Sequence, residues 1–481
     1  MARLGAITDL RRGDVWPANQ LATEVARRAR VLAKLGVGPG NHVVIAHGGT
    51  PSFFADLFAV WRRGACAVCV NARLTTSELS NIVEFVTPSA VLVDDGTISD
   101  GDGIDVPVLC TGDEKALDEQ SSPGTLSLDD PALILFTSGT TGVPKGVVHT
   151  FRSLSARIAL NQAFIGAARM TTSLCLLPTH FGHGLIGNCL TPLFAGGNLL
   201  LFADSGPRAA AKLGAILTEH QVTFMSSVPT VWKIAFKTGR PPEESHLQQV
   251  HVGSAPLSAD HWRAIADWTG TDNVVNMYGI TETANWAAGA SARQWAAEDG
   301  LVGTMWGGGA AIKNADGEIY GEDGREGEIL LQTPSLMTGY HKRPDLTDQV
   351  LRDGWYHTGD IGRIDGDGII RLTGREKEEI NHAGIKVHPA ELDLLLERHP
   401  DVVEACAFGV PDEISGEVVG VAIQAIDGAD IGAGILRRWC AERIKPEGIP
   451  QKWYFIAAIP KTDRGKINRK AVMEFCLKGI T

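Results

Sequence analysis

The sequence predicts an α/β fold: a large N-terminal domain of stacked, mostly parallel α/β sheets with a β-rich subdomain, followed by a small mobile α+β C-terminal domain. Three observations support this prediction. Strand and helix patterns alternate from the N-terminus to about Leu301, short β-like segments with Gly-Asp turns follow, and the charged stretch 372–380 precedes a compact final unit. The 481 residues also exceed the length of one ordinary domain.

The composition is that of a globular protein that does not attract polyanions by charge alone. Lys and Arg number 44 against 56 Asp and Glu, a net charge of −12, which disfavours non-specific binding to nucleic acid or anionic membranes. No run approaches the roughly 20 apolar residues that span a bilayer, and the N-terminus has no apolar signal core. We therefore expect a cytoplasmic protein without integral membrane association and without a nucleic-acid partner.

The eight cysteines are scattered along the chain, which suits reduced thiols. Cys66 and Cys69 have the Cys-x-x-Cys spacing of zinc and redox sites. They lie, however, in the apolar run 65–70, and a strand there would point the two thiols to opposite faces. The pair is therefore predicted to be structural.

The first elements alternate between helix and strand. Apolar residues at helical spacing predict a helix over 20–35, which the glycines between Gly36 and Gly40 would end. The next predicted elements are strands at 42–46, 65–70 and 90–93 and helices at 53–62 and 75–85. The polar stretch 94–130 is typical of surface connections.

The alternation continues after a strand, loop and strand at 133–149. Thr150 is predicted to cap a helix that ends near Ile165. The elements expected after it are strands at 174–178, 199–202, 223–226, 250–252 and 274–276 and helices at 185–194, 209–220 and from Pro229 onward. Three polar loops follow strand ends, at 179–184, 253–256 and 277–283, and open α/β sheets bind ligands at such ends.

The β-rich subdomain is predicted at about 301–376, from β-like segments at 327–331 and 368–372. We expect the large domain to cover 1–376 and the small domain 377–481. The small domain should contain a helix at 390–398, strands at 402–409 and 418–423, and a polar terminal segment at 460–470.

The loop at 137–146 is the clearest ligand-binding candidate. Glycines allow backbone N–H groups to converge, hydroxyls add donors, and a lysine adds positive charge, so a polyphosphate is the expected guest. The residues are Thr137, Ser138, Gly139, Thr140, Thr141, Gly142 and Lys145. The spacing excludes a Walker-type P-loop, and a solvated Ser/Thr/Gly turn is the alternative interpretation.

Taken together, these segments resemble the adenylate-forming superfamily of acyl-CoA synthetases, luciferases and peptide-synthetase adenylation domains, and most closely a free-standing acyl- or aryl-CoA ligase. The resemblance covers nearly the whole chain, with motifs in the expected order at 137–146, 253–256, 278–282, 356–360, 374–375 and 460–469. It implies that a carboxylate attacks the α-phosphate of ATP to give an acyl-adenylate and pyrophosphate. A thiol then takes the acyl group, so ATP, Mg²⁺ and coenzyme A are the implied cofactors.

The resemblance also implies roles for single residues. Lys466 would bridge the substrate carboxylate and the α-phosphate, Thr281 would bind the α-phosphate, and Glu282 would be the Mg²⁺ ligand. The nucleotide would be held by Gly253, Ser254, Ala255, Tyr278, Asp360 and Arg375. Lys377 would be the hinge of the C-terminal domain, and coenzyme A would pass Ala383, Gly384 and Lys386.

The implied acyl pocket departs from the family pattern. Its expected lining is Phe181, His183, Val228, Met277 and Trp286. Phe181 stands where many relatives have histidine, and 178–197 contains no acidic residue for a substrate ammonium, which disfavours an α-amino acid. The stretch 286–290 has no arginine for a second carboxylate. We expect an aryl or short-to-medium-chain monocarboxylate.

Three functional hypotheses stay open. The first is a CoA ligase. The second is an adenylating enzyme that passes the acyl group to an acyl carrier protein or an amine. The third is a non-catalytic nucleotide-binding sensor, which retention of Glu282, Asp360, Arg375 and Lys466 disfavours. Either a monomer or a homodimer is compatible with the sequence.

Overall fold

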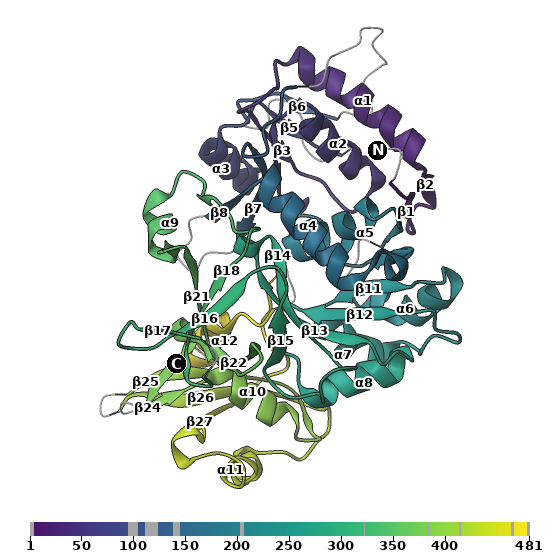
Figure 1. Ribbon diagram of the computed structural model, residues 1–481. Helices are drawn as coiled ribbons and strands as arrows, with labels where there is room; N and C mark the ends of the chain where they lie inside the picture. Colours follow the sequence, from purple (N-terminus) through teal and green to yellow (C-terminus); the bar gives the residue numbers. More distant parts are fainter. Residues whose placement is uncertain are drawn as a thin grey trace.

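The computed structural model describes residues 4–94, 104–110, 124–137, 145–202, 206–321, 323–382, 385–412, 415–462 and 466–478. The described residues form three β-sheets, of seven, fifteen and five strands. In Figure 1 the seven-stranded sheet lies at the top, the fifteen-stranded sheet crosses the middle, and the five-stranded sheet of the C-terminal domain lies at the bottom. This arrangement confirms the predicted large α/β domain and small α+β domain.

The seven-stranded sheet has the order β19-β8-β7-β4-β3-β5-β6 and is parallel except at β8 and β19. Its strands are β3 (His42–Ile45), β4 (Cys66–Cys69), β5 (Ala90–Leu92), β6 (Val108–Leu109), β7 (Pro131–Thr137), β8 (Lys145–Thr150) and β19 (Gly339–Tyr340). Its helices are α1 (Ala18–Lys34), α2 (Pro51–Arg62), α3 (Thr76–Val86) and α4 (Phe151–Ile165). Thr150 caps α4 as predicted, because its side chain accepts a hydrogen bond from the Ser153 N–H.

The second sheet begins as a parallel α/β layer. Its strands here are β1 (Ile7–Asp9), β2 (Asp14–Trp16), β9 (Thr172–Cys175), β10 (Asn198–Leu201), β11 (Phe224–Ser227), β12 (Gln249–Gly253) and β13 (Val274–Ile280). The helical segments are η1 (Ala167–Met170), η2 (His183–Leu190), α5 (Thr191–Phe194), α6 (Pro207–Glu219), α7 (Pro229–Thr238) and α8 (Ala259–Thr269). The carboxyl ends of β11, β12 and β13 share one edge, since these three strands are parallel neighbours.

The β-rich part continues this second sheet through antiparallel pairings of β14 and β15. Its strands are β14 (Asn285–Ser291), β15 (Leu301–Met305), β16 (Gly309–Lys313), β17 (Ile319–Tyr320), β18 (Glu326–Gln332), β20 (Leu351–Arg352), β21 (Trp355–Asp365) and β22 (Ile369–Arg375). The helical turn η3 (Thr281–Thr283) and helix α9 (Pro344–Val350) belong to the same region. The β-rich part and the parallel layer therefore form one continuous hydrogen-bonded sheet.

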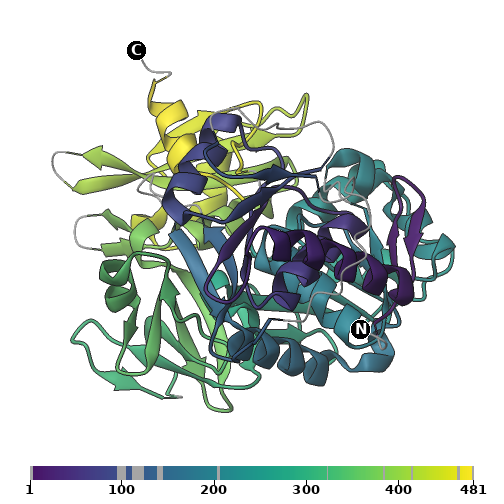
Figure 2. The same ribbon diagram turned by 90° about the horizontal axis from the view of Figure 1, so that it is seen from above.

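The C-terminal domain follows the turn η4 (Glu376–Glu378). Its strands are β23 (Ile380–His382), β24 (Ile385–Val387), β25 (Val402–Asp412), β26 (Gly416–Ala425) and β27 (Lys452–Phe455). Its helices are α10 (Pro389–Glu397), α11 (Ala433–Ala441) and α12 (Arg469–Lys478), with the turn η5 (Pro446–Gly448). Figure 2, seen from above, places this domain on one side of the molecule and the N-terminal α/β layers on the other.

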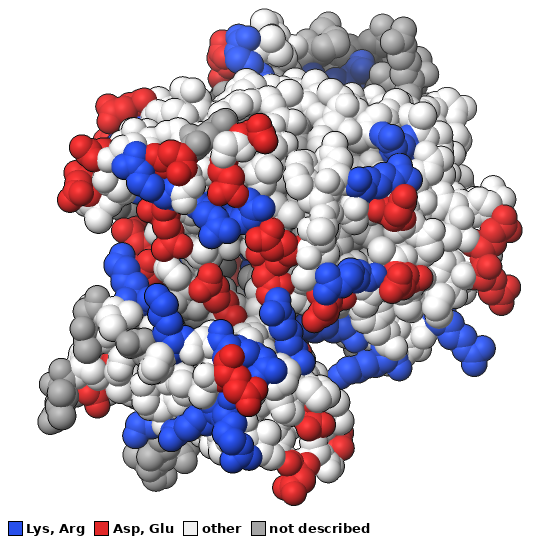
Figure 3. Space-filling view, turned by 60° about the horizontal axis from the view of Figure 1, so that its bottom comes forward, with Lys and Arg blue, Asp and Glu red and all other residues white. Residues whose placement is uncertain are grey.

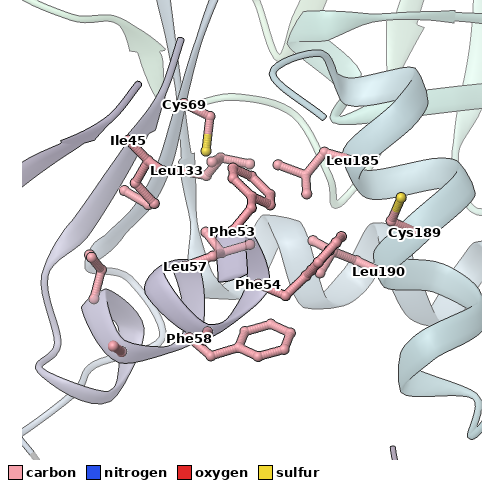
Figure 4. Close-up of a cluster of buried hydrophobic side chains, with 14 of the residues drawn as sticks. Ile45, Phe53, Phe54, Leu57, Phe58, Cys69, Leu133, Leu185, Cys189 and Leu190 are labelled. Atoms are coloured by element: carbon pink, nitrogen blue, oxygen red, sulfur yellow. The ribbon is translucent and has the colours of Figure 1, made fainter. Parts of the chain in front are cut away.

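The largest core lies between the two α/β sheets. In Figure 4 the side chains of Phe53, Phe54 and Leu57 on α2 face Leu185 and Leu190 on η2, and all five are fully buried. Each such side chain contributes about 1.5–3 kcal/mol when it leaves water. This shared apolar layer fixes η2 relative to both sheets, and η2 carries part of the candidate site.

The structure confirms the interpretation of the Cys-x-x-Cys pair. Both thiols lie on β4, with Cys69 in the core between the sheets and Cys66 in a different apolar cluster that also contains α3. Burial raises the pKa of both thiols far above its ordinary value. The pair therefore has neither the common face nor the thiolate character of a zinc or redox site.

Some element predictions were wrong. The helix expected from Leu185 begins at His183 as a π-helix, and β13 runs through Ile280, so part of the loop expected at 277–283 is strand. The stretch 94–130 contains the short strand β6 within its described part. In the described part of the chain, no helix is both long and apolar enough to cross a membrane.

The two domains are docked through ion pairs. Lys233 on α7 lies 2.9 Å from Glu397 on α10 and 3.5 Å from Glu404 on β25. Arg398 pairs with Asp299 across the same boundary. Figure 3 shows positive and negative side chains interspersed on the face that includes this domain. The C-terminal domain is thus held in one defined orientation over the larger one.

Candidate active site

The site is centred on His183, the first residue of η2. Its ring lies between two hydroxyls: Nδ1 is 2.8 Å from the Oγ of Ser254, and Nε2 is 2.6 Å from the Oγ of Ser226. Ser226 is on β11 and Ser254 directly follows β12. Three separate segments therefore fix the imidazole at the carboxyl edge of the parallel strands, where the sequence predicted ligand binding.

Ser254 adopts an unusual backbone conformation. Its φ is +69°, in the left-handed region that residues other than glycine rarely occupy. The contact with His183 gives this conformation a partner that stabilises it. Local strain of this kind occurs preferentially at ligand sites, and here it lies in a predicted nucleotide-binding segment.

Lys466 comes to this site from the far end of the chain. It lies next to an antiparallel β-bridge between Lys461 and Ile467. Its carbonyl accepts a hydrogen bond from the Thr462 N–H at 2.8 Å. Burial, and in addition the positive charge of Lys466, lowers the pKa of His183 to about 3. The lysine thus acts electrostatically on the imidazole, which is neutral at physiological pH.

A second group of contacts joins Tyr278, Asp360 and Arg375. The Tyr278 hydroxyl donates to Oδ2 of Asp360 at 2.6 Å, and Nε of Arg375 donates to Oδ1 at 2.5 Å. The Asp360 carboxylate raises the pKa of Arg375, because its negative charge stabilises the guanidinium. Each carboxylate oxygen keeps further acceptor capacity for another donor, such as a sugar hydroxyl.

Glu282 lies beside the basic end of β8. Its Oε1 accepts a hydrogen bond from the Tyr340 hydroxyl at 2.7 Å, and Nζ of Lys145 lies 5.6 Å from the centre of the Tyr340 ring. The described residues contain no group of three or more His, Cys, Asp or Glu side chains arranged to hold a metal. A single half-exposed carboxylate fits Mg²⁺ only when phosphate oxygens and water complete its coordination.

Buried contacts hold the turn that carries Thr281 and Glu282. His149 on β8 has Nε2 2.8 Å from the Thr281 carbonyl, and burial lowers its pKa to about 4. Arg157 on α4 donates to the Thr283 carbonyl at 3.3 Å and to the Ser335 hydroxyl. The neutral His149 and the guanidinium together fix the backbone on which the two predicted catalytic residues stand.

The predicted acyl-pocket residues are only partly brought together. Trp286 on β14 lies edge-on to His183, with ring centres 5.5 Å apart. Met277 on β13 is the strand partner of Gly253 on β12. A Cβ atom added to Gly253 would lie 2.9 Å from the Met277 carbonyl oxygen, so a side chain at position 253 would clash with β13. Phe181 lies in the turn before η2, and Val228 is the N-cap of α7, packed against two apolar cores.

The remaining predicted residues are placed in part. Thr137 and Lys145 are paired at the ends of β7 and β8, while Ser138, Gly139, Thr140, Thr141 and Gly142 lie outside the described residues. Ala383 and Gly384 also lie outside them. Lys386 pairs with Glu379 at 2.8 Å, and Lys377 is exposed in the turn η4. Ala255 follows Ser254 at the end of β12.

Sequence reasoning missed several residues of the site. Ser226 and His251 lie on β11 and β12, and the rule that ligands bind at the carboxyl ends of parallel strands could have indicated them. Tyr340 and His149 gave no such signal. Tyr340 is placed by the pairing of β19 with β8, which joins segments nearly two hundred residues apart, and His149 contacts Thr281, which is 132 residues away.

Comparisons with known proteins agree with this geometry. The model of a family described as AMP-binding enzyme matches residues 6–341, and that of the AMP-binding enzyme C-terminal domain matches 391–466. The chain is 31% identical to a feruloyl-CoA synthase of an Amycolatopsis species, over 94% of this chain and 92% of that protein. It is 29% identical to an oxalate–CoA ligase of Arabidopsis thaliana, over 94% and 91%. The crystal structure of ATP-bound MatB from Rhodopseudomonas palustris superposes with a TM-score of 0.88 at 26% identity, covering 98% of this chain and 95% of that one.

Proposed function

The chain belongs to the AMP-binding enzyme family, and on that premise we propose that it is an AMP-forming acyl-CoA ligase. It activates a carboxylic acid with ATP, releases pyrophosphate, and transfers the acyl group to the thiol of coenzyme A. The observation that carries the proposal is the hydrogen-bonded group of Tyr278, Asp360 and Arg375, which joins three separate sequence motifs. Lys466, from the terminal segment, would act at the strand-end site that contains His183 and Ser254.

In the first half-reaction a carboxylate oxygen attacks the α-phosphate and pyrophosphate leaves. Negative charge accumulates between the two anions, and the ammonium of Lys466 stabilises it. Lys145 and the hydroxyl-rich loop that begins at Thr137 hold the departing phosphates. When bound, Mg²⁺ neutralises phosphate charge, and Glu282 would hold it, positioned by the Tyr340 hydroxyl.

The nucleoside is held by the group around Asp360. Its carboxylate accepts the ribose hydroxyls, and Arg375 and Tyr278 orient it through the hydrogen bonds already described. The segment Gly253, Ser254 and Ala255 flanks the adenine. Thr281, whose carbonyl is fixed by His149, contributes its hydroxyl to the α-phosphate.

The second half-reaction requires the C-terminal domain to turn. We place the domain boundary at residue 376, where β22 has ended and the exposed turn with Lys377 begins. Rotation about this turn removes Lys466 from the site and brings Ala383, Gly384 and Lys386 toward the entering thiol. A carrier-protein phosphopantetheine or an amine is the alternative acceptor.

The eight free cysteines suit a reducing cytoplasm, where ATP and coenzyme A are available.

The substrate is a small carboxylic acid. The names of the two relatives point in different directions, one to an aryl acid and one to a two-carbon acid. The absence of an acidic side chain from 178–197 opposes an amino acid, as the sequence indicated. An aryl or short-to-medium-chain monocarboxylate is therefore the proposed class.

Carboxylate-dependent exchange of pyrophosphate into ATP tests the first step. A panel of aryl, alkyl and hydroxy acids should contain at least one that supports exchange well above the acid-free rate. Coenzyme A, phosphopantetheinylated carrier protein and simple amines are then offered to the activated acid, and coenzyme A should be preferred. Exchange with none of the acids would contradict the proposal and favour a nucleotide-binding sensor.

A further inference from the structure

A cavity of about 370 Å³ lies where strand ends from both large sheets come together. Its lining comes from the carboxyl ends of β1, β3, β5 and β10, or from residues just after them, and from helix α6. Small-molecule sites commonly have a volume in this range, and parallel α/β layers place them at such strand ends. The proposed mechanism uses no residue of this cavity.

Four cationic side chains line the cavity. Arg11 and Arg12 lie on the turn after β1, and Oδ1 of Asp9 holds this turn by accepting hydrogen bonds from their two backbone N–H groups, at 2.9 and 3.3 Å. Arg208 and Lys212 are four residues apart near the start of α6, so they share one face of that helix. Like charges at this spacing repel each other, and a bound anion relieves the repulsion.

The carboxylates of the cavity do not neutralise these cations. Asp9 is 3% exposed, and its hydrogen bonds are directed at the backbone of the arginine turn. Asp94 lies 3.6 Å from Arg12, and both side chains are open to solvent, so this pair is weak. Four positive against two negative side chains leave the cavity positive in a protein whose net charge is −12. It therefore favours a ligand with several negative charges.

The rest of the lining suits a nucleotide better than a plain anion. Phe202, directly after β10, and Leu10 supply apolar surface. Thr50, the N-cap of α2, also lines the cavity, so the N-terminal end of that helix adds partial positive charge. An aromatic base packs on apolar side chains, whereas phosphates pair with guanidinium and ammonium groups. The cavity offers both kinds of contact.

The cavity adjoins the loop that leads to the candidate active site. Gly49, on the cavity wall, donates its N–H to Oγ1 of Thr179 at 3.0 Å. Thr179 precedes His183, the centre of the site, by four residues, so the two lie at most about 14 Å apart. Only a short distance therefore separates the cavity from the reacting groups.

We infer that the cavity binds the nucleotide end of coenzyme A, with Arg208, Lys212 and the two arginines after β1 at its phosphates and Phe202 beside its adenine. The inference rests on the proposed transfer to coenzyme A and adds a binding site to it. The pantetheine arm separates the thiol of coenzyme A from its phosphates, so the phosphates must bind away from the reacting acyl group. The phosphates of ATP are already assigned to Lys145 and Lys466, which leaves those of coenzyme A for the cavity.

Isothermal titration calorimetry on the full chain tests this binding without turnover. The ligand is adenosine 3′,5′-bisphosphate, a fragment of the nucleotide end of coenzyme A, and ATP with Mg²⁺ is added first to fill the proposed ATP site. Inorganic phosphate is titrated separately. Arg208→Gln/Lys212→Gln removes two of the four cations, and Lys237→Gln/Arg240→Gln, at the exposed end of α7, is the matched control. Circular dichroism establishes that both variants are folded.

The bisphosphate should bind the wild type in the presence of ATP. Its Kd should rise about tenfold in the cavity variant Arg208→Gln/Lys212→Gln and stay near the wild-type value in the control. Pantetheine has no phosphates. The ratio of the KM for pantetheine to the KM for coenzyme A should therefore fall about tenfold in the cavity variant.

Three results would overturn the inference and leave acid activation standing: no binding of the bisphosphate once ATP is present, an unchanged Kd in the cavity variant, or equally tight binding of inorganic phosphate. Absence of pyrophosphate exchange with every acid would instead overturn acid activation. The calorimetry would then still decide whether the cavity binds the nucleotide, because it needs no carboxylic acid.

Discussion

Tyr340 illustrates how single side chains outside the recognisable motifs shape the site. Its hydroxyl donates to Glu282 at 2.7 Å, while its ring lies near the ammonium of Lys145. Burial, together with the Glu282 charge, raises the pKa of the Tyr340 hydroxyl, so the phenol stays protonated and remains a donor. One residue thus orients a carboxylate proposed for the metal and restrains a cation proposed for the phosphates.

Tyr340→Phe removes only the hydroxyl. A hydrogen bond to a charged group contributes about 1.5–3 kcal/mol, so a less restrained Glu282 should raise the half-saturating Mg²⁺ concentration of the exchange reaction about three- to tenfold. Magnesium titrations at fixed ATP measure this. Tyr320→Phe is the control, because Tyr320 lies on β17, where its hydroxyl donates to Glu318. Equal magnesium dependence in wild type and Tyr340→Phe would contradict the assigned role.

Some residues that the sequence predicted from separate motifs lie together in the structure. Tyr278, Asp360 and Arg375, expected from separate motifs, are joined by hydrogen bonds in the structure. Ser226 and His251 were not predicted, because their position near strand ends is a signal that many other residues share. Their importance arises only when β11, β12 and η2 are placed side by side.

At the scale of elements, the docking of α7 against the C-terminal domain is the feature most open to test. Burial alone would lower the pKa of Lys233, but the carboxylates of Glu397 and Glu404 outweigh that effect and raise it. Lys461, in the hairpin that precedes Lys466, also pairs with Glu404 at 3.1 Å. The ion pairs therefore connect α7 to the hairpin that delivers the proposed catalytic lysine.

Lys233→Met should weaken this docking. With a loss of about 1 kcal/mol, the domain would spend several-fold less time in the observed orientation. The rate of adenylation, measured as pyrophosphate release in a single turnover, should fall about three- to fivefold. The rate of thioester formation from supplied acyl-adenylate should change less. Lys237→Met is the control, because Lys237 is exposed in the last turn of the same helix. Equal slowing of both steps, or the same effect in the control, would count against the docking role.

Element prediction worked for long apolar segments and failed for short ones. The strands of the parallel layers and helices α1 to α4 follow apolar runs with clear periodicity, and they were predicted within a few residues. The strands β1, β2 and β6 have two or three residues each, too few to show a period, and they form at or next to the edges of larger sheets. The π-helical start of η2 is also set by packing, since Gly184 and Gly187 touch neighbouring chain segments.

At the scale of the whole molecule, the site is assembled from both domains in an acidic protein. Its net charge of −12 cannot attract a nucleotide triphosphate over long distances, so local cations and donors must hold the phosphates. Under the proposed mechanism Lys145, Arg375 and Lys466, which are far apart in sequence, supply these local charges. The fold also buries several neutral histidines around the site.

Those histidines make stability depend on pH. Burial lowers the pKa of His149 from 6.5 to about 4 and that of His251 well below 6.5. Between pH 6.5 and 4 the unfolded chain therefore binds protons that the folded protein does not, and the free energy of unfolding should fall as pH falls. The slope is about 1.4 kcal/mol per pH unit for each such histidine.

Urea unfolding of wild type and His149→Gln at pH 7, 6 and 5 measures this dependence. Glutamine keeps a donor for the Thr281 carbonyl but cannot take up a proton in this range. The variant should lose less stability on acidification, by about 1 kcal/mol per pH unit below pH 6. Parallel pH dependence of the two proteins would show that His149 is protonated equally in the folded and unfolded states.

The most direct test of the central claim is the effect of Lys466→Ala on the two half-reactions, measured separately. Lys470→Ala, exposed on α12 shortly after Lys466, is the control for general disturbance. Loss of the charge that stabilises the forming bond should reduce carboxylate-dependent pyrophosphate exchange about 10²- to 10³-fold, while thioester formation from supplied acyl-adenylate is largely kept. Pyrophosphate exchange at the wild-type rate in Lys466→Ala would contradict the account.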